Sequence, residues 1–406
     1  MKLNPSVTSL IQYASKTIAR RTEADPSIIN LAIGEPDFGP PEYLREHLGT
    51  LTSPESVKSA LKKYQVSFGS ADLRRAIADY YQRHSELYVD ADTELLITHG
   101  GAGGLVLTIL TCSEPGDEIL VPDPSYMLYE RTVQVLGRRP VRVPRNAEAG
   151  FRYDIGRIDS AITNRTRAII VNSPENPTGY VCEEAELREL VTFCARRDMW
   201  LIHDEVYDRL VFSGVHHPAL AFDPARRNVI LVNSFSKKFG VPGLRVGWIV
   251  GDQHFISAAA KVHDYCNLAL NKVGETLAEA LLVDPRCDDW LSSTCRELDR
   301  RRQNAVAAVS SVPGLSIACE VRGGMFVLVD VRNIFERVSS GRNAEATPGE
   351  VVASWMLEDT KVAAVPGIVY GTSCAETVRV VFSVDETKFS EAFARMALRT
   401  EALTAK

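Results

Sequence analysis

The sequence has little that would direct the chain to a membrane, to nucleic acid or to an oxidising compartment. No apolar run approaches the roughly 20 residues that span a bilayer, and the first residues lack the continuous apolar segment of a secretory signal. Lysine and arginine number 46 against 52 aspartate and glutamate, a net charge of −6, which argues against nucleic acid or a membrane surface as a partner. The 8 cysteines form no C-x-x-C pair, so we expect free thiols rather than disulfides or a zinc site. These absences predict a cytoplasmic protein.

The length and composition predict a folded protein of more than one domain. The chain has 406 residues, of which 45% are hydrophobic and 24% charged, and it contains no internal repeat or low-complexity tract. At roughly 100–200 residues per domain, this length suggests two or three domains. A composition this apolar supports an ordinary core, so disorder is not expected.

Short apolar runs alternate with stretches of helical periodicity through the middle of the chain. Six runs rich in β-branched residues are expected to be strands: Leu95–Thr98, Glu118–Val121, Ala168–Val171, Trp200–Ile202, Val229–Val232 and Val246–Val250. Most are separated by expected helices over Gly103–Thr111, Tyr126–Leu136, Glu183–Arg197 and Val262–Leu282. Fully apolar strands that alternate with helices indicate a parallel sheet buried on both faces. We therefore expect an α/β fold.

The C-terminal part has a different pattern. A long charged helix is expected first, and three strands and a further helix follow it: Asp288–Val309, then Ser316–Glu320, Met325–Asp330, Val378–Phe382 and the helix near Pro348–Leu357. This is an α+β pattern. We therefore divide the chain into an N-terminal arm and loop (1–45) that packs on the small domain or a partner subunit, a large domain (46–285) and a small C-terminal domain (286–406).

Polar side chains follow five of the expected strands directly. The five stretches combine turn-forming residues with a polar, acidic, aromatic or basic group: His99–Gly104, Pro122–Tyr126, Asn172–Gly179, His203–Tyr207 and Asn233–Lys238. In an open parallel sheet, ligands bind beyond the carboxyl ends of the strands. The sequence therefore predicts that these stretches converge on one rim, where the functional site lies.

The glycine-rich stretch after the first of these strands suits a phosphate. Glycines that open a helix expose backbone N–H groups at its positive end. The stretch His99–Gly104 is neither a P-loop nor a G-x-G-x-x-G fingerprint, because Val106 stands where the last glycine would be. A tight turn between strand and helix explains the glycines equally well.

A lysine and an arginine follow the strand Val229–Val232. Lys237 is expected to be partly withdrawn from water, which lowers the pKa of its amine and favours the neutral nucleophile of Schiff-base chemistry. A surface position suits its neighbour Lys238 better. Arg245 lies among glycines and valines and therefore needs an anion, either a phosphate or a structural carboxylate.

Asp204 follows the apolar run Trp200–Ile202 and is expected to be buried. A buried carboxylate stays ionised only beside a cation, a metal or strong donors, and a protonated ring nitrogen of a cofactor is one such partner. His203 and Glu205 point to alternate faces of the strand, so no metal site is predicted.

Five motifs taken together resemble the class I and II aminotransferases, which are fold-type I pyridoxal-phosphate (PLP) enzymes. The motifs lie in the family's order between about Asn30 and Val384: Gly34–Phe38, Tyr64 with Gly69 and Leu73-Arg74, Asn176–Gly179, Asp204–Tyr207, and Ser234–Lys237 with Gly243–Gly247. They are similar to the family's G-x-P-D-F loop, Y…G…L-R segment, N-P-T-G turn, D-E-x-Y segment and S-x-S-K…G-x-R-x-G signature. The resemblance implies PLP as the cofactor. It also implies a large domain with a mostly parallel sheet between helices, beside a smaller α+β C-terminal domain.

The resemblance assigns roles in catalysis and cofactor binding to the matching positions. Lys237 is implied to carry PLP covalently and then to move a proton as general acid and base, while Asp204 keeps the ring nitrogen protonated. The implied contacts of the PLP ring are Tyr207 and Asn176 on the phenolic oxygen and Tyr126 stacked on the ring. The implied contacts of the phosphate are the amides of Gly101 and Ala102, Ser234, Ser236 and Arg245.

The resemblance also implies how substrate and partner bind. Arg379 is implied to clamp the α-carboxylate of the substrate, with help from Asn176 and the backbone of Gly34. Tyr64 is implied to reach the phosphate of the other subunit, so a homodimer with shared active sites is expected. The small-molecule partners are an amino acid and a 2-oxo acid.

Several positions depart from the family's pattern and limit the choice of substrate. The stretch Gly100–Gly104 has no hydroxyl or lysine where relatives often have one, Pro40 stands where a threonine is common, and Asn267–Lys272 replaces a stretch usually rich in serine and threonine. We identify no second arginine for a dicarboxylate substrate. Glu175 could select a cationic side chain, but a solvated loop position is the more ordinary interpretation.

These features predict a PLP-dependent aminotransferase. We expect it to move an amino group between an L-α-amino acid and a 2-oxo acid by a ping-pong mechanism, in amino acid metabolism or biosynthesis. Another PLP reaction stays open, namely a β- or γ-lyase, a cyclase or an oxygen-dependent amino acid oxidase, because the groups around PLP steer its chemistry. A non-enzymatic ligand sensor is disfavoured, since Lys237 is present and no DNA-binding module is seen before Asn30. A nicotinamide-dependent dehydrogenase is disfavoured as well, since only the glycine cluster suggests it.

Overall fold

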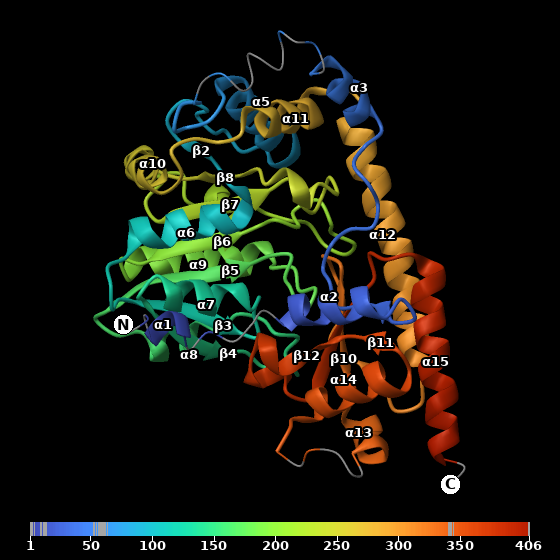
Figure 1. Cartoon of the computed structure of the whole chain (residues 1–406). Helices are drawn as coiled ribbons and strands as arrows, with labels where there is room; N and C mark the ends of the chain where they lie inside the picture. Colours follow the sequence, from blue (N-terminus) through green and yellow to red (C-terminus); the bar gives the residue numbers. More distant parts are fainter. Residues whose placement is uncertain are drawn as a thin grey trace.

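The structure is a computed structural model that describes residues 3, 5–8, 10, 14–51, 53, 55, 62, 64–339, 343 and 345–404. Parts of the predicted N-terminal arm, residues 1–2, 4, 9 and 11–13, lie outside the described residues. The described residues form sheets of seven, four and two strands. Figure 1 shows the largest sheet in the middle of the chain and the four-stranded sheet in the orange C-terminal part.

The largest sheet has the strand order β2-β8-β7-β6-β5-β3-β4. Its strands are β2 (Leu95–Thr98), β3 (Glu118–Asp123), β4 (Arg139–Pro144), β5 (Thr166–Asn172), β6 (Trp200–Asp204), β7 (Val229–Ser234) and β8 (Gly247–Val250). Neighbouring strands from β4 to β7 are parallel, so the mostly parallel α/β sheet is confirmed. β8 is antiparallel to both β2 and β7, because a loop without an α-helical crossover leads into it from β7.

β4 was not among the strands that the sequence predicted. It is an edge strand that pairs with β3 alone, and two arginines and two prolines stand among its residues. Edge strands are partly solvated and tolerate proline, so they lack the continuous apolar run that marks a central strand.

Helices cover both faces of this sheet. Leu95 and Ile97 of β2 pack in one hydrophobic layer and Leu96 packs in the opposite one. Because successive side chains of a strand point to opposite faces, a sheet covered on both sides needs apolar residues throughout. The first layer contains α3 (Tyr43–Thr50), α5 (Ala71–Ser85), α8 (Ile155–Ala161), α9 (Glu184–Arg196) and α11 (Lys272–Val283), and the second contains α6 (Gly100–Cys112), α7 (Leu128–Val135) and α10 (Gln253–Asn267).

The helical stretch expected over Val262–Leu282 is two helices, so that prediction was wrong. α10 ends at Asn267 and α11 begins at Lys272. Between them Leu268 has a φ of 63°, and the Asn271 side chain accepts hydrogen bonds from the N–H groups of Val273 and Gly274. A tight turn at Leu268, closed by a hydrogen bond from the N–H of Ala269 to the carbonyl of Asn267 at 2.8 Å, ends the first helix, and an asparagine cap begins the next. The apolar periodicities of the two helices merge in the sequence although the helices cover opposite faces.

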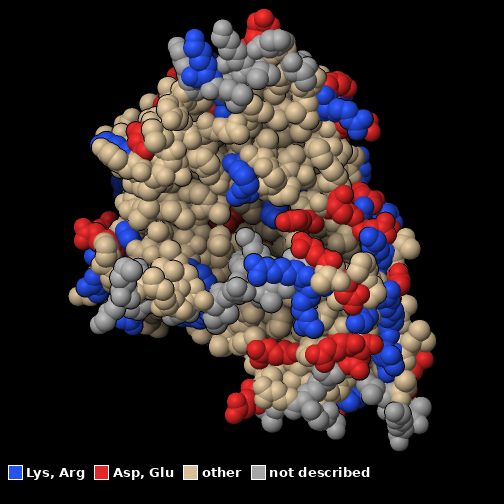
Figure 2. Space-filling view, viewed as in Figure 1, with Lys and Arg blue, Asp and Glu red and all other residues tan. Residues whose placement is uncertain are grey.

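The C-terminal part is built on an antiparallel sheet of order β12-β13-β10-β9. Its elements are α12 (Cys287–Ser310), β9 (Ser316–Ile317), β10 (Phe326–Asp330), α13 (Arg332–Val338), α14 (Pro348–Asp359), β12 (Val365–Pro366), β13 (Thr377–Val381) and α15 (Glu386–Thr404). The long helix α12 runs beside α15 (Figure 1). Figure 2 shows acidic and basic side chains interspersed over these helices, and Arg300 of α12 pairs with Glu386 of α15 at 2.6 Å.

The N-terminal part pairs with the C-terminal part of the chain in a separate two-stranded sheet. It contains α1 (Pro5–Thr8), α2 (Ala14–Ala24) and β1 (Ile29–Asn30), and β1 pairs in parallel with β11 (Val362–Ala363). The backbone continues the pairing, since the N–H of Val381 donates to the carbonyl of Leu31 at 2.9 Å. This pairing brings the loop after Leu31 beside β13, which carries Arg379. Among the described residues we find no helix with the length and apolar character that a membrane crossing requires.

Candidate active site

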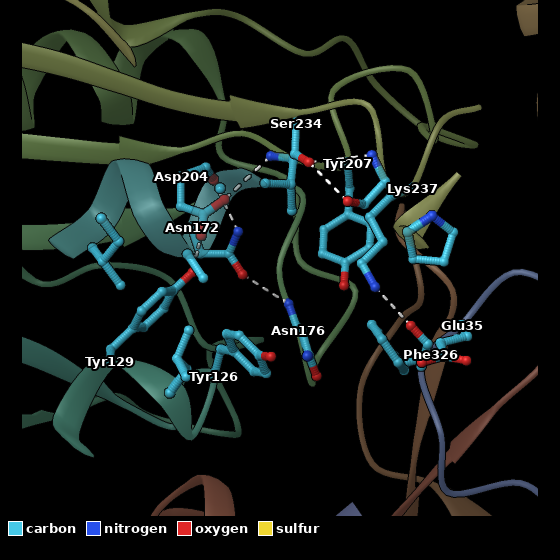
Figure 3. A pocket seen from close by; sticks show the side chains of 18 of the residues that line it. Glu35, Tyr126, Tyr129, Asn172, Asn176, Asp204, Tyr207, Ser234, Lys237 and Phe326 are labelled. Carbon is cyan, nitrogen blue, oxygen red and sulfur yellow. Dashed lines mark hydrogen bonds between the residues drawn. The ribbon is translucent and has the colours of Figure 1, made fainter. Parts of the chain in front are cut away.

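A cavity of about 790 Å³ lies at the carboxyl ends of the central parallel strands (Figure 3). Asn172, Asp204 and Ser234 are the last residues of the neighbouring strands β5, β6 and β7, and all three line it. The face of the molecule in Figure 2 is hollowed near its centre, with charged side chains around the hollow. Every predicted site residue except Tyr64 lines the cavity: Gly34, Gly101, Ala102, Tyr126, Asn176, Asp204, Tyr207, Ser234, Ser236, Lys237, Arg245 and Arg379.

Lys237 extends into the cavity from the loop after β7. Its Nζ donates a hydrogen bond to the carbonyl oxygen of Gly34 at 2.7 Å. Burial lowers the pKa of the Lys237 amine to about 8; the charge of Glu35 opposes this shift, and Arg379 adds to it. A lysine with this pKa is neutral in a useful fraction near neutral pH, which is what a nucleophile or a proton acceptor requires.

Asp204 is buried at the opposite side of the cavity. Its Oδ2 accepts a hydrogen bond from the Tyr129 hydroxyl at 2.7 Å, and its Oδ1 accepts one from the N–H of Val206 at 3.2 Å. Burial raises the pKa of Asp204 to about 6, although both donors act in the other direction. A further cation beside this carboxylate would hold it ionised.

Several residues that line the cavity were not predicted from the sequence, and two of them bond directly to predicted site residues. One is Tyr129, which lies one helical turn after Tyr126 and whose ring stands at 90° to that of Tyr126. The other is Asn172, whose amide donates to the carbonyl of Asp204 at 2.9 Å and whose Oδ1 accepts from the N–H of Asn176 at 3.0 Å. The spacing from Tyr126 could have indicated Tyr129. Asn172 joins the Asn176 turn to β6, a contact between distant segments.

Donors from three segments surround one corner of the cavity. The first-turn amides of α6, at Gly101 and Ala102, lie at the positive end of that helix. The hydroxyls of Ser234 and Ser236 are 2.9 Å apart. Arg245, with a φ of 55°, donates to the carbonyls of Pro242 at 3.0 Å and His99 at 3.5 Å. This set of donors fits a phosphate.

Gly100 is required by the approach of Arg245. Its φ is 70°, and a Cβ there would come within 2.6 Å of Arg245 Nη2. The glycine therefore allows the Arg245 guanidinium to pack closely against the start of α6, and the role of the stretch in phosphate binding stays a prediction.

Arg379 is a buried cation with a solvent exposure of 2%. Its guanidinium lies 4.4 Å from the ring of Phe326 and 5.2 Å from that of Tyr370. It donates to the carbonyl of Ala32 and, at 3.4 Å, to Oδ1 of Asn176. Among the described residues no carboxylate pairs with it, and its Nε has no hydrogen-bond partner. A buried guanidinium in this state is suited to bind an anion, and a carboxylate is one anion that it fits.

Tyr64 does not line the cavity of its own chain. Its side chain is 83% exposed. The sequence analysis assigned it to the site of the other subunit, and that assignment stays a prediction.

Two expectations about neighbouring residues were wrong. Lys238, expected at the surface, is completely buried and pairs with Asp208 at 2.6 Å. Glu175, expected to be solvated, is completely buried and pairs with Arg145, so it is not available to a substrate. A single sequence shows neither burial, because both depend on a partner more than 25 positions away. Among the described residues no group of three or more His, Cys, Asp or Glu could hold a metal ion.

The residues present fit PLP. The anion corner suits its phosphate, Lys237 suits its aldehyde carbon, and Asp204 suits a protonated ring nitrogen. Tyr126 and Val206, which both line the cavity, supply an aromatic and an apolar surface for its ring.

Comparison with known proteins agrees with this fit. The family described as aminotransferase class I and II matches residues 26–396. The chain is 28% identical over 397 residues to the probable aspartate/prephenate aminotransferase of Aquifex aeolicus, covering 97% of this chain and 95% of that protein. It is 32% identical over 358 residues to kynurenine–oxoglutarate transaminase 3 of Homo sapiens, covering 84% of this chain and 77% of that protein.

A solved structure extends the similarity to the whole fold. The aromatic aminotransferase of Pyrococcus horikoshii superposes with a TM-score of 0.84 at 28% identity, covering 95% of this chain and all of that one. The family predicted from the motifs is confirmed: this chain belongs to the class I and II aminotransferases, which use PLP to transaminate amino acids.

Proposed function

We propose that the cavity is the active site of this PLP-dependent aminotransferase, with Lys237, Asp204 and Arg379 as its central groups. The observation that carries the proposal is that a half-buried amine, a buried carboxylate and a buried guanidinium come from separate elements to line one cavity. Withdrawing three charged groups from water in one place is costly unless ligands compensate them. PLP and the substrate carboxylate supply the compensation.

Each of these groups has a defined task in the transfer. Bound PLP supplies an electron sink that weakens the Cα–H bond of the amino acid. Lys237 would hold PLP covalently between turnovers and would carry the proton on Nζ, for which its lowered pKa suits it. Asp204 would keep the ring nitrogen protonated. Tyr207 and Asn176 would bind the phenolic oxygen, and Tyr126 would contact the ring. Two half-reactions then follow in a ping-pong order.

We assign the phosphate and the substrate carboxylate to two different groups of lining residues. The phosphate would be held by the amides of Gly101 and Ala102, the hydroxyls of Ser234 and Ser236, and Arg245. The carboxylate would be held by Arg379, Asn176 and the Gly34 backbone.

The lining favours a substrate with an uncharged side chain. The cations among the described lining residues are Lys237, Arg245 and Arg379, and each already has a task, so none is left for a second carboxylate. Glu35, whose charge acts on Lys237, adds negative charge to this part of the cavity. Ile33 and Leu128 supply apolar wall. The aromatic aminotransferase among the similar structures is consistent with this choice.

A homodimer with shared active sites is the proposed assembly. An exposed set of large apolar side chains lies on two segments held together through Ser67: Tyr64 at 83%, Val66 at 65%, Tyr265 at 94% and Leu268 at 63%. The Ser67 hydroxyl donates a hydrogen bond to the Asp264 carboxylate. The Ser67 carbonyl oxygen lies 3.0 Å from Nδ1 of His263, within hydrogen-bond distance. Exposed apolar side chains that gather in this way mark an interface. Tyr64 would then reach the phosphate in the partner's cavity.

The domain division and the location remain proposals as well. We propose an N-terminal arm at 1–45, a large domain at 46–285 and a small domain at 286–406. The division at residue 286 is supported by a separate hydrophobic cluster, most of whose members lie within residues 298–396. This cluster is distinct from the two hydrophobic layers that cover the large sheet. All 8 cysteines are free, which suits the reducing cytoplasm. We propose a role in amino acid biosynthesis on the ground of the family's reaction alone.

The test is the visible absorption of the PLP-loaded enzyme under anaerobic conditions. Phenylalanine, leucine and methionine should remove the visible band and a 2-oxo acid should restore it, while aspartate should act at least about tenfold more slowly, a difference of about 1.4 kcal/mol. Lys237→Ala should abolish turnover, and Lys261→Ala, at an exposed lysine of α10, should not. Turnover retained in Lys237→Ala would refute the assignment of that lysine.

The same experiment separates the rival PLP reactions. Release of ammonia without a 2-oxo acid acceptor would identify a lyase. A change in the visible absorption that occurs only when oxygen is present would identify an oxidase. A preference for aspartate would refute the proposed side-chain class and leave transamination standing.

A further inference from the structure

Asp123, the last residue of β3, accepts hydrogen bonds from a segment of the C-terminal part of the chain. Its carboxylate is 1% exposed. Oδ2 accepts from the N–H of Thr372 at 3.0 Å and from the Thr372 hydroxyl at 2.9 Å, and Oδ1 accepts from the N–H of Ser373 at 3.1 Å. Three donors on one buried carboxylate come from two adjacent residues that lie about 250 positions away.

The segment around Gly371 leaves room for the Asp123 carboxylate because it has a glycine at the point of closest approach. Gly371 has a φ of 150°, and a Cβ there would lie 1.9 Å from Asp123 Oδ1. On either side, the N–H of Ser125 donates to the carbonyl of Tyr370 at 2.9 Å, and Arg142 of β4 donates to the same carbonyl at 3.4 Å. Arg142 Nη1 is also 3.7 Å from Asp123 Oδ2. The backbone of Tyr370 is therefore held against the end of β3.

The Tyr370 ring lies against the proposed substrate clamp. It is completely buried and stands 5.2 Å from the guanidinium of Arg379, whose other ring neighbour is Phe326. Arg379 has no carboxylate of the described residues to orient it, so the two rings, the Ala32 carbonyl and Asn176 set the plane of its guanidinium. Tyr370 is the member of this group whose backbone depends on Asp123.

We propose that Asp123 is a positioning residue for substrate binding: it fixes Tyr370, and through Tyr370 it orients Arg379 toward the substrate carboxylate. The inference rests on the proposed role of Arg379. A bidentate clamp depends on angle as well as distance, and a small misplacement of a binding group lowers its effect strongly. Asp123 also lies three positions before Tyr126, so one loop serves the ring and the carboxylate clamp together.

Asp123→Asn in the PLP-loaded enzyme tests the proposal. The variant keeps the size of the side chain but presents an NH₂ group where an oxygen accepts a hydrogen bond. We expect the KM of the amino donor to rise about tenfold or more while kcat changes less than threefold. The affinity for PLP and the visible band should stay unchanged, since Asp123 does not line the cavity.

Asp117→Asn is the matched control. Asp117 is 5% exposed, precedes β3 at its other end, accepts from the N–H of Glu114 at 2.9 Å and pairs with Arg167 at 3.4 Å. Its loss should lower stability without a change in KM. Thr372→Val, which removes one donor, should raise KM less than Asp123→Asn does, and Thr372→Ser should restore the wild-type value. If Asp123→Asn does not fold, these two variants decide.

The outcomes separate the inference from the function on which it rests. An unchanged KM in Asp123→Asn, or a loss of PLP affinity that parallels the rise in KM, would overturn the positioning role. Arg379→Lys should raise KM at least as much as Asp123→Asn. An unchanged KM in Arg379→Lys would overturn the proposed clamp and this inference with it. A large effect of Arg379→Lys beside none of Asp123→Asn would overturn the inference alone.

Discussion

The hydroxyl of Tyr129 donates a hydrogen bond of 2.7 Å to Oδ2 of Asp204. Tyr129 is almost completely buried. The N–H of Val206 donates a hydrogen bond to the other carboxylate oxygen of Asp204. Donors of this kind favour the ionised carboxylate against the effect of burial. The tyrosine therefore supports the charge that a protonated PLP ring nitrogen needs.

Tyr129→Phe should lower kcat by about tenfold or more. A hydrogen bond to a charged group contributes about 1.5–3 kcal/mol, and about 1.4 kcal/mol corresponds to a factor of ten in rate. Steady-state kinetics and a pH titration of the visible band measure the effect. Tyr43→Phe is the control, because the Tyr43 hydroxyl donates to the carbonyl of Leu281 and lies outside the cavity. A kcat within twofold of wild type would contradict the role of Tyr129.

The rate at which the PLP-free enzyme takes up PLP should depend on pH through Lys237. Only the neutral amine attacks the aldehyde, and burial lowers the pKa of Lys237 from 10.5 to about 8. The rate should therefore rise with pH and level off above about 8. Glu35→Gln removes the charge that opposes the shift, so its profile should move to lower pH. The rate of PLP uptake can be followed by absorbance. A rate that keeps rising with pH up to about 10.5, the pKa of an ordinary lysine, would refute this prediction.

The buried pair of Lys238 and Asp208 should be a large contribution to stability. Burial acts to raise the pKa of Asp208, but Lys238 together with His216 and the Tyr80 hydroxyl holds that pKa below its usual value. Lys238→Met leaves the carboxylate buried without its cation and should cost about 3–5 kcal/mol in the free energy of unfolding.

Denaturant titration measures this cost against two controls. The double variant Lys238→Met with Asp208→Leu should recover part of the loss, since neither charge remains. Lys388→Met, at an exposed lysine of α15, should change stability by no more than about 0.5 kcal/mol. A loss of that small size in Lys238→Met would show that the pair contributes little.

Leu268→Asp should dissociate the proposed homodimer. Leu268 is 63% exposed beside Tyr265, and a carboxylate in a buried apolar interface is unfavourable. Leu398 on α15 offers a matched control, because it is 68% exposed and lies on a different helix. Sedimentation should show a monomer for Leu268→Asp and a dimer for Leu398→Asp. A dimer in both variants would place the interface elsewhere.

The positions of most strands of the large sheet and the gathering of the site could be predicted because both follow from local pattern. β2, β3, β5, β6 and β7 each contain a continuous apolar run, which is typical of strands covered on both faces. Parallel strands end at one edge, so Asp204 and Ser234 could be assigned to one site although 30 positions separate them. The break between α10 and α11 escaped prediction, because two adjacent amphipathic helices have one continuous periodicity.

The motifs of the chain thus identify the family and most of the side chains that line the cavity, since each motif is short and its residues follow a strand. The partners of those side chains could not be read from the motifs. Tyr129 on Asp204, Asp123 on Thr372, Asp208 on Lys238 and Arg145 on Glu175 are all contacts between segments that meet only in the folded chain. Such contacts depend on which strand lies beside which and on how deeply each group is buried, and a linear pattern of residue types carries neither quantity.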